Sequence, residues 1–136
     1  MLEEYIKKID ANSLNGSDLA YIGDAYYELY IRSYLLSLGY TKPEELHKLC
    51  INYVSAKSHV KIYAAIQELL TEKEVNVFNR GKNYNYRHHS KSTNVKDYLT
   101  SSGFEALIGY LYVTGQNDRL NEILGLSLKI IEDKKN

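Results

Sequence analysis

The sequence of 136 residues contains no tryptophan and only one proline, one methionine and one cysteine. A lone cysteine, Cys50, excludes an internal disulfide and suits a reducing compartment. Its surroundings, LHKLCINYV, have the spacing of an amphipathic helix, so we expect a buried, unreactive thiol rather than a nucleophile. No apolar run is long enough to span a membrane, and the acidic start MLEEYIKKID differs from the basic start of a signal peptide. These absences predict a soluble, cytoplasmic protein with no membrane partner.

The chain also lacks an excess of either charge. Its 17 Lys and Arg residues balance 17 Asp and Glu residues, so any signal for an anionic partner must be local. The hydrophobic content of 44% and charged content of 25% are ordinary for a globular protein, and the length fits one domain, 1–136, with a single core. The 14 tyrosines indicate either wet or oligomeric contact surfaces, or simply a tyrosine-rich core and surface.

Apolar residues recur at helical spacing along nearly the whole chain, and we find no persuasive β-strand. The pattern therefore predicts an all-α fold. We expect helices over residues 2–9 and 17–38, one that starts at 41, another over 54–70 after a kink near Ser55, and further helices over 71–81, 95–113 and 118–133.

Capping signals mark the expected helix ends. Gly39 is expected at the C′ position after one helix, and Gly115 is expected to stop another. Residues 41–44 and 71–74 both have the Thr-x-x-Glu spacing of a capping box, and Asn117 or Asp118 is expected to cap the last helix. The intervening segment KNYNYRHHSKSTN shows no periodicity and predicts a loop.

Two of the expected helices carry an acid close to a glycine within an apolar pattern. LAYIGDAYYELY contains Gly23-Asp24, although glycine in a helix costs about 1 kcal/mol relative to alanine and a buried carboxylate needs a partner. In SSGFEALIGYLYV, Glu105 has small helical neighbours, which we expect to leave space for water, an ion or a phosphate: Ser101, Ser102 and Gly109. Facing carboxylates on packed helices hold divalent cations, so Asp24 and Glu105 are a candidate metal pair. The alternative is two solvated surface acids.

A basic stretch lies between these helices. No Asp or Glu occurs between Glu74 and Asp97, whereas basic and amide side chains gather there. Such groups suit the phosphates and 2′-hydroxyls of duplex RNA, and the alternative is a solvated loop. Adjacent His88 and His89 without a third ligand are weak evidence for a metal site. The candidate RNA contacts are Arg80, Lys82, Asn83, Arg87, His88 and Lys91.

The two acid-bearing segments resemble the signatures of the ribonuclease III catalytic domain. LAYIGDAYYELYIR is similar to the family's Gly-Asp-Ala signature with its following glutamate, and GFEALIGYLYV is similar to its Phe-Glu-Ala-Leu-Ile-Gly signature. The order of these segments and the intervening VSAKS and RGKN resemble the Mini-III ribonucleases, a branch with the catalytic domain but no double-stranded-RNA-binding domain. The resemblance spans about residues 14–124.

The resemblance implies a single ribonuclease III-type helical domain that acts as a symmetric homodimer. It implies a Mg²⁺-dependent endoribonuclease that cleaves double-stranded RNA, leaving 5′-phosphates and 3′-hydroxyls. The implied substrate is the 23S ribosomal RNA precursor, with a ribosomal protein as a candidate accessory. Asp24 matches the family's catalytic aspartate and Glu105 its metal-binding glutamate. Glu28 matches a recurrent glutamate that supports the site or the fold, and Asp18 and Asp97 are candidates for outer support only.

Two positions depart from the ribonuclease III pattern. The family carries an acid four residues before the aspartate, where this chain has Ala20, and an aspartate three residues before the glutamate, where it has Ser102. Mg²⁺ tolerates two carboxylates because it keeps waters and binds substrate phosphate, so weak binding without RNA is expected. The missing acids also leave open a catalytically inactive module that binds RNA or ribosomal components. A helical hydrolase of a small phosphorylated metabolite is the third alternative.

Overall fold

The computed structural model describes residues 1–84 and 94–133. No strand occurs within these residues, so the prediction of an all-α fold is confirmed. The helices of the described residues are α1 (Leu2–Ile6), η1 (Ala11–Ser13), α2 (Gly16–Ser37), α3 (Pro43–Val54), α4 (Ala56–Ile66), η2 (Gln67–Leu69), α5 (Glu72–Tyr84), α6 (Val95–Val113) and α7 (Asn117–Glu132). None of the helices in this part of the chain is both long and apolar enough to cross a membrane.

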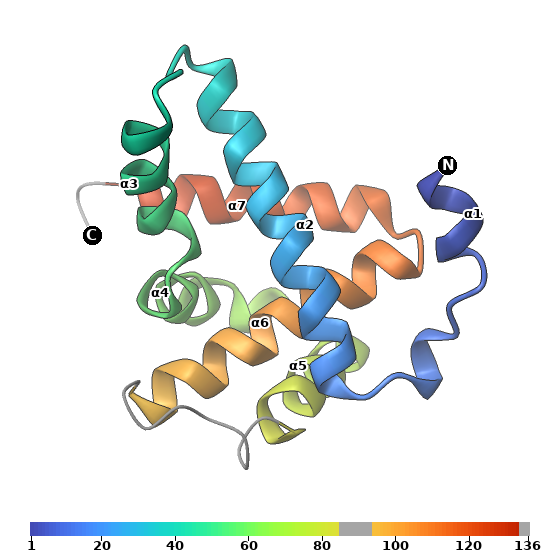
Figure 1. Cartoon of the computed structure of the whole chain (residues 1–136). Helices are drawn as coiled ribbons and strands as arrows, with labels where there is room; N and C mark the ends of the chain where they lie inside the picture. The colour runs from blue at the N-terminus through green and yellow to red at the C-terminus, as the bar shows by residue number, and fades with distance from the viewer. Residues whose placement is uncertain (85–93, 134–136) are drawn as a thin grey trace.

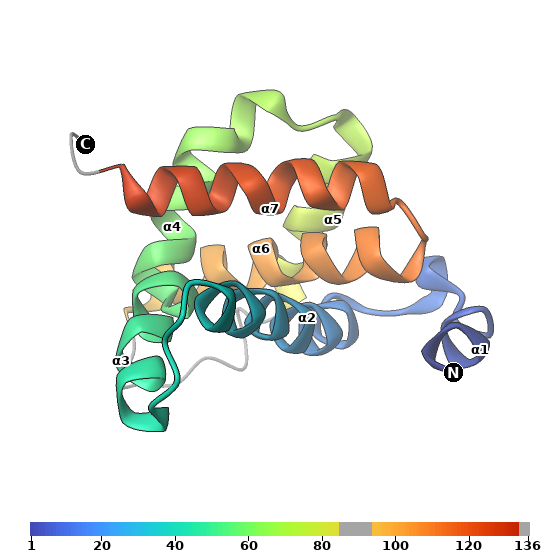
Figure 2. The same cartoon turned by 90° about the horizontal axis from the view of Figure 1, so that it is seen from above.

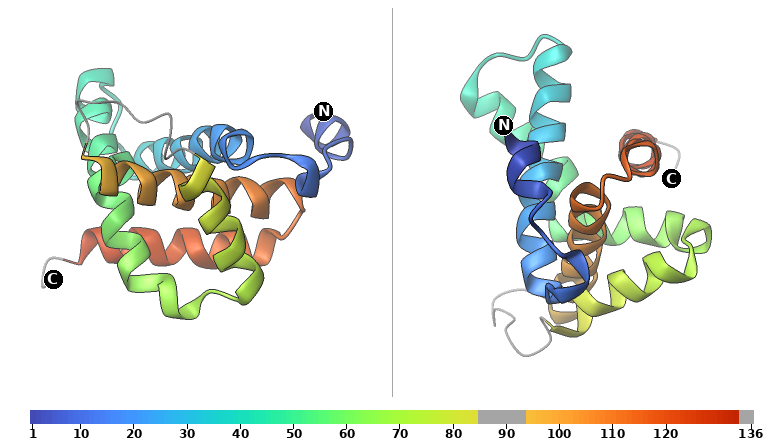
Figure 3. Two further views of the ribbon diagram at one scale, coloured as in Figure 1. Left: turned by 90° about the horizontal axis from the view of Figure 1, so that it is seen from below. Right: turned by 90° about the vertical axis from the view of Figure 1, so that its right-hand side faces the viewer.

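Helix α6 runs through the middle of the molecule. It lies between α2 and α7, as Figure 2 shows, and α2 crosses it steeply in Figure 1. Helices α4 and α5 pack against α6 as well, and α3 and α1 lie at opposite ends of the molecule (Figure 3). Phe104, Leu107 and Leu111 of α6 are fully buried. Since α6 has buried side chains on all sides, it is the core helix on which the others pack.

Glycines bring α2 and α6 into close contact. A Cβ atom added at Gly23 would lie 1.8 Å from the backbone oxygen of Glu105, and one added at Gly109 would lie 2.0 Å from that of Leu19. Neither position has room for a methyl group, so each helix has a glycine where the backbone of the other crosses it. The glycine beside Asp24 is therefore required by packing.

The small residues near Glu105 do not leave the space that we expected from the sequence. The Ser101 hydroxyl oxygen lies 2.7 Å from Nδ1 of His59 on α4. The backbone oxygen of Ser102 lies 2.9 Å from where a Cβ atom at Gly81 of α5 would be, and Gly109 contacts α2. This prediction is wrong because a small residue accommodates a neighbouring helix as readily as a ligand.

One of the two predicted capping boxes is confirmed. The Glu74 N–H donates to Thr71 Oγ1 at 3.1 Å, and the Thr71 N–H donates to Glu74 Oε1 at 2.9 Å. The box predicted at 41–44 is wrong, because α3 follows Lys42 without a side-chain cap and Pro43 starts the helix. The kink expected near Ser55 is a break between α3 and α4, and the Ser55 hydroxyl oxygen accepts an N–H of the first turn of α4.

Other helix ends differ from prediction by a few residues. Helix α1 ends at Ile6, earlier than predicted, whereas α5 continues to Tyr84, beyond the predicted end. Gly39 and Gly115 have φ of 101° and 72° at the C′ positions of α2 and α6, so the predicted C′ residue Gly39 and the predicted helix stop at Gly115 are both confirmed. The predicted cap of α7 is wrong, since Gln116 precedes that helix and makes no side-chain cap bond.

A partly buried ion pair joins α5 to α7. Arg119 donates through Nε to Glu74 Oε2 at 2.9 Å and through Nη2 to Glu74 Oε1 at 2.8 Å. Nη2 also donates to the Leu69 carbonyl oxygen at 2.8 Å. Burial alone would raise the pKa of the Glu74 carboxyl, but hydrogen bonds from Arg119 and Thr71 hold it below its ordinary value. The pair thereby stabilises the packing of α5 against α7.

Candidate active site

Asp24 and Glu105 meet where α2 crosses α6. Gly23 lies on the backbone of Glu105, so the next residue along α2 is beside the same turn of α6. The two carboxyl groups are within hydrogen-bonding distance of each other. Asp24 is exposed and Glu105 is half-buried. The structure therefore brings together the two acids that the sequence singled out, at a position open to the surface.

The environment of Glu105 favours its protonated form. Burial, reinforced by the hydrogen bond to Asp24 and the charge of that residue, raises the pKa of Glu105 to about 9. In the metal-free protein at neutral pH, the pair therefore holds a proton. A divalent cation can replace that proton, because it neutralises both carboxylates at once.

The chemistry of the pair fits Mg²⁺. Both side chains supply hard oxygen donors, which this ion prefers. Within residues 1–84 and 94–133, no group of three or more His, Cys, Asp or Glu side chains is arranged to hold a metal. Ala20 and Ser102, which replace the two further acids of the family, are both buried in the helix packing. Water and a substrate phosphate would therefore complete the coordination of an ion held by the pair.

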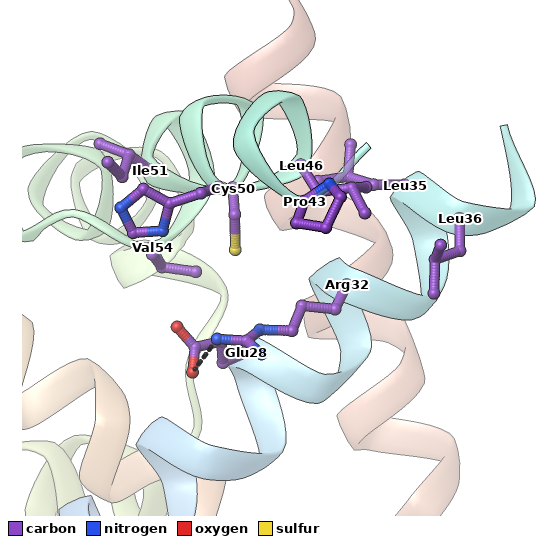
Figure 4. Close-up of a pocket in the computed structure, with 10 residues that line it drawn as sticks. Glu28, Arg32, Leu35, Leu36, Pro43, Leu46, Cys50, Ile51 and Val54 are labelled. Carbon is purple, nitrogen blue, oxygen red and sulfur yellow. Dashed lines mark ion pairs between the residues drawn. The ribbon is translucent and has the colours of Figure 1, made fainter. Parts of the chain in front are cut away.

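Glu28 is paired with a cation on its own helix. Arg32 Nη2 lies 3.2 Å from Glu28 Oε2, one turn away on α2, and both side chains are exposed. Figure 4 shows this ion pair beside the groove between α2 and α3. An exposed i,i+4 pair contributes only about 0.3–0.5 kcal/mol. Of the two roles that the resemblance leaves open for Glu28, the geometry favours support of the fold.

The groove between α2 and α3 has a volume of about 400 Å³ and a mostly apolar lining. The Cys50 sulfur points into it, toward Glu28 and Arg32 (Figure 4). Cys50 is 6% exposed, and burial is the main cause that raises the pKa of its thiol. The sequence-based expectation of a buried Cys50 is confirmed, and the raised pKa disfavours the reactive thiolate.

Asp18 and Asp97 lie in the first turns of α2 and α6. The Asp18 carboxylate accepts the Asn15 N–H at 3.3 Å, while the Asp18 N–H donates to Asn15 Oδ1 at 2.8 Å. The Asp97 N–H donates to Asn94 Oδ1 at 3.2 Å. Both aspartates belong to helix starts, where a negative charge is also favourable to the helix dipole.

The predicted RNA contacts fall into two groups. Arg87, His88 and Lys91 lie outside the described residues. Lys82 and Asn83 are exposed near the end of α5, in a position to meet a ligand. For all five, contact with RNA stays a prediction.

Arg80, the sixth predicted RNA contact, is held by the protein itself. Its Nη2 donates to the Ala11 carbonyl oxygen at 3.1 Å. Its Nε is buried and has no hydrogen-bond partner among the residues that the structure describes. The Arg80 guanidinium therefore connects α5 to the segment before α2, and its contact with RNA also stays a prediction.

Sequence reasoning missed a histidine in the core next to the acid-bearing turns. His59 of α4 is 1% exposed, and its ring contacts those of Tyr27 and Phe104. Its partners come from other helices, so no local motif marks it. The only signal was its place on the apolar face of its helix, in register with Ile62 and Ile66.

The chain is similar to known proteins of one family. The family model of the Ribonuclease III domain matches residues 17–116. The Mini-ribonuclease 3 of Enterococcus faecalis is 45% identical over 122 residues, which cover 88% of this chain and 92% of the relative. That of Streptococcus pneumoniae is 40% identical over 126 residues, covering 91% of this chain and 98% of the relative.

The fold has a solved counterpart as well. The crystal structure of a protein from Fusobacterium nucleatum matches with a TM-score of 0.78 at 33% identity, covering 86% of this chain and 94% of that one. Sequence, fold and the paired acids thus point to one family. The chain belongs to the Mini-ribonuclease 3 branch of the ribonuclease III endoribonucleases.

Proposed function

We propose that this chain cleaves double-stranded RNA with the help of Mg²⁺ held by Asp24 and Glu105, and that residues 1–136 form one catalytic domain. The observation that carries the proposal is the contact between these two carboxyl groups at the crossing of α2 and α6. Two acids so close together on rigid helices form a site for a cation.

Each part of the site has a role that follows from its position. The glycine contacts fix the distance between α2 and α6, and hence between the acids. Asp24, the exposed member, is accessible from the surface where a substrate would approach, and the partly buried Glu105 would supply the second carboxylate ligand. When bound, the ion supplies positive charge against the scissile phosphate and lowers the pKa of water. In-line attack would leave the 5′-phosphate and 3′-hydroxyl products that the resemblance implies.

We propose that the duplex contacts the end of α5 and the segment after it. The exposed Lys82 and Asn83 support this, since an ammonium and an amide suit phosphate and 2′-hydroxyl groups. The full set of proposed RNA contacts is Arg80, Lys82, Asn83, Arg87, His88 and Lys91.

We further propose that the enzyme is a symmetric homodimer. One acid pair cannot serve both strands of a duplex, whereas two copies can present one site to each strand. Helix α2 supports this proposal, because Tyr21, Leu29 and Leu36 leave 83%, 61% and 53% of their surface exposed along one face. Leu36 also lines the apolar groove, so the two surfaces are continuous. A second copy would cover such an apolar stripe.

For the biological role we propose cytoplasmic maturation of the 23S ribosomal RNA precursor, with a ribosomal protein as a candidate accessory. The balanced charge of the chain supports an accessory. Tight nonspecific binding to RNA needs many cationic contacts, and this chain has no excess of positive charge.

Incubation with duplex RNA, single-stranded RNA and a panel of nucleotides, each with and without Mg²⁺, tests the proposal. We expect cleavage of the duplex alone, and only with the ion. Binding of duplex RNA without cleavage would favour the inactive module that Ala20 and Ser102 left open. Hydrolysis of a nucleotide instead would favour the metabolite hydrolase.

A further inference from the structure

Three aromatic rings from three helices meet in the core beside the acid-bearing turns. The ring centroids of Tyr27 on α2 and His59 on α4 are 5.1 Å apart, and those of His59 and Phe104 on α6 are 4.8 Å apart. The Tyr27 and Phe104 rings close the triangle at 5.4 Å. Tyr27 follows Asp24 by one helical turn, and Phe104 directly precedes Glu105. The cluster thus contacts both helices that carry the acids.

His59 makes one polar contact in this cluster. Its Nδ1 lies 2.7 Å from the Ser101 hydroxyl, which is one turn before Glu105 on the same face of α6. Its Nε2 has no hydrogen-bond partner in the described part of the chain. Burial lowers the pKa of His59 to about 4, so the ring is neutral at neutral pH. The bond to Ser101 is therefore what distinguishes histidine from an apolar side chain at this position.

We propose that His59 is a positioning residue of the active site. Through Ser101 and Tyr27 it fixes the rotation of α6 relative to α2, so that Glu105 faces Asp24. The glycine contacts between α2 and α6 set the distance between the helices at their crossing, and the His59 contacts act next to that crossing, on the turns that carry the acids. Tyr27 is itself held, because its O–H donates to the Tyr53 carbonyl oxygen at 3.0 Å. This inference rests on the proposed function, since it assumes that the acid pair holds an ion.

Substitutions that separate the two ring nitrogens test the proposal. In His59→Asn the side-chain amide occupies the place of Nδ1, whereas in His59→Gln it reaches the place of Nε2. The probe is Mn²⁺ alone, with the free ion measured by electron paramagnetic resonance on the full-length protein. We expect His59→Gln and His59→Leu to raise the Mn²⁺ dissociation constant roughly tenfold, and His59→Asn to stay near the wild-type value.

Two further variants separate positioning from stability. Ser101→Ala removes the same hydrogen bond with a minimal change of volume, and should weaken Mn²⁺ binding as His59→Leu does. Arg119→Met breaks the partly buried pair with Glu74 and should lower the melting temperature without changing Mn²⁺ affinity. Circular dichroism identifies the folded variants, and Ser101→Ala gives the answer if His59→Leu does not fold.

The inference is overturned if folded His59→Leu or Ser101→Ala binds Mn²⁺ as tightly as the wild type. It is also overturned if Arg119→Met weakens binding equally, since loss of stability would then explain the effect. Failure of the proposed function looks different: the wild type itself would neither bind Mn²⁺ nor cleave duplex RNA.

Discussion

Gly23 on α2 lies against the backbone oxygen of Glu105 on α6, and this contact brings the adjacent Asp24 to the Glu105 carboxyl. The Gly-Asp pair therefore acts as a unit. Gly23 allows α2 and α6 to pack closely, and this close packing places Asp24 beside Glu105. Gly23 lowers the stability of α2 relative to alanine, but the acid pair forms only because a glycine stands at this position.

Gly23→Ala should damage both stability and activity. The added methyl group would lie 1.8 Å from a backbone oxygen, which cannot move without shifting α6. We expect the free energy of unfolding to fall by about 3 kcal/mol and cleavage of duplex RNA to be lost. Urea denaturation and a cleavage assay measure the two effects.

Gly125→Ala on α7 is the matched control. Apart from its chain neighbours and the backbone of its own helix, no described atom lies within 4 Å of a Cβ atom at Gly125, which is exposed in a helix. This change should raise the free energy of unfolding by about 1 kcal/mol and leave cleavage unchanged. A Gly23→Ala protein as stable and active as the control would contradict the close packing of α2 on α6.

Glu105 should make the stability of the metal-free protein depend on pH. Its pKa is about 9 in the folded state against an ordinary value of 4.5, so the folded protein keeps a proton that the unfolded chain releases in between. The contribution of protonated Glu105 to the free energy of unfolding is fully present below pH 4.5 and is lost as pH rises through about 9. Denaturation in EDTA across this range should show the decline, and Glu105→Gln should remove it. The same slope in both proteins would rule out this role of Glu105.

The proton held by the acid pair must leave when a cation binds. The Mg²⁺ concentration for half-maximal cleavage should therefore fall as pH rises from neutral towards about 9. Cleavage rates over a grid of pH and Mg²⁺ concentration measure this linkage, with RNA binding in EDTA as the reference. A Mg²⁺ requirement that does not change with pH would show that the pair is already ionised.

Lys82→Glu should weaken binding to duplex RNA and lower the slope of log affinity against log salt by about one. The side chain is exposed at the end of α5, so folding should not change. Fluorescence anisotropy at several salt concentrations measures the effect. Lys129→Glu, an equal charge change on the exposed surface of α7, should have little effect. Equal losses for the two variants would mean that only overall charge matters.

The sequence predicted most of the fold because its signals are local. Helical periodicity identified α2 and α6, and the box at 71–74 forms between neighbouring residues. The prediction failed where two different residues could start a helix: α3 starts at Pro43, without the side-chain cap expected from Thr41. Local patterns do not decide between two such possibilities.

The site was predictable only in part. The resemblance singled out Asp24 and Glu105, and their contact follows from the crossing of two long helices. The inward hydrogen bond of Arg80 and the His59–Ser101 pair were not predictable, because each partner is distant along the chain. Nor does spacing show whether a small residue accommodates a ligand or a helix.

Asp24→Asn tests the central claim most directly, because it removes one charge from the acid pair and keeps the shape of an exposed side chain. The measurement is the rate of duplex RNA cleavage at saturating Mg²⁺, with the melting temperature and the RNA affinity in EDTA determined on the same sample. We predict cleavage at the background rate, with melting temperature and affinity unchanged. Cleavage at the wild-type rate would contradict an active site built on Asp24 and Glu105.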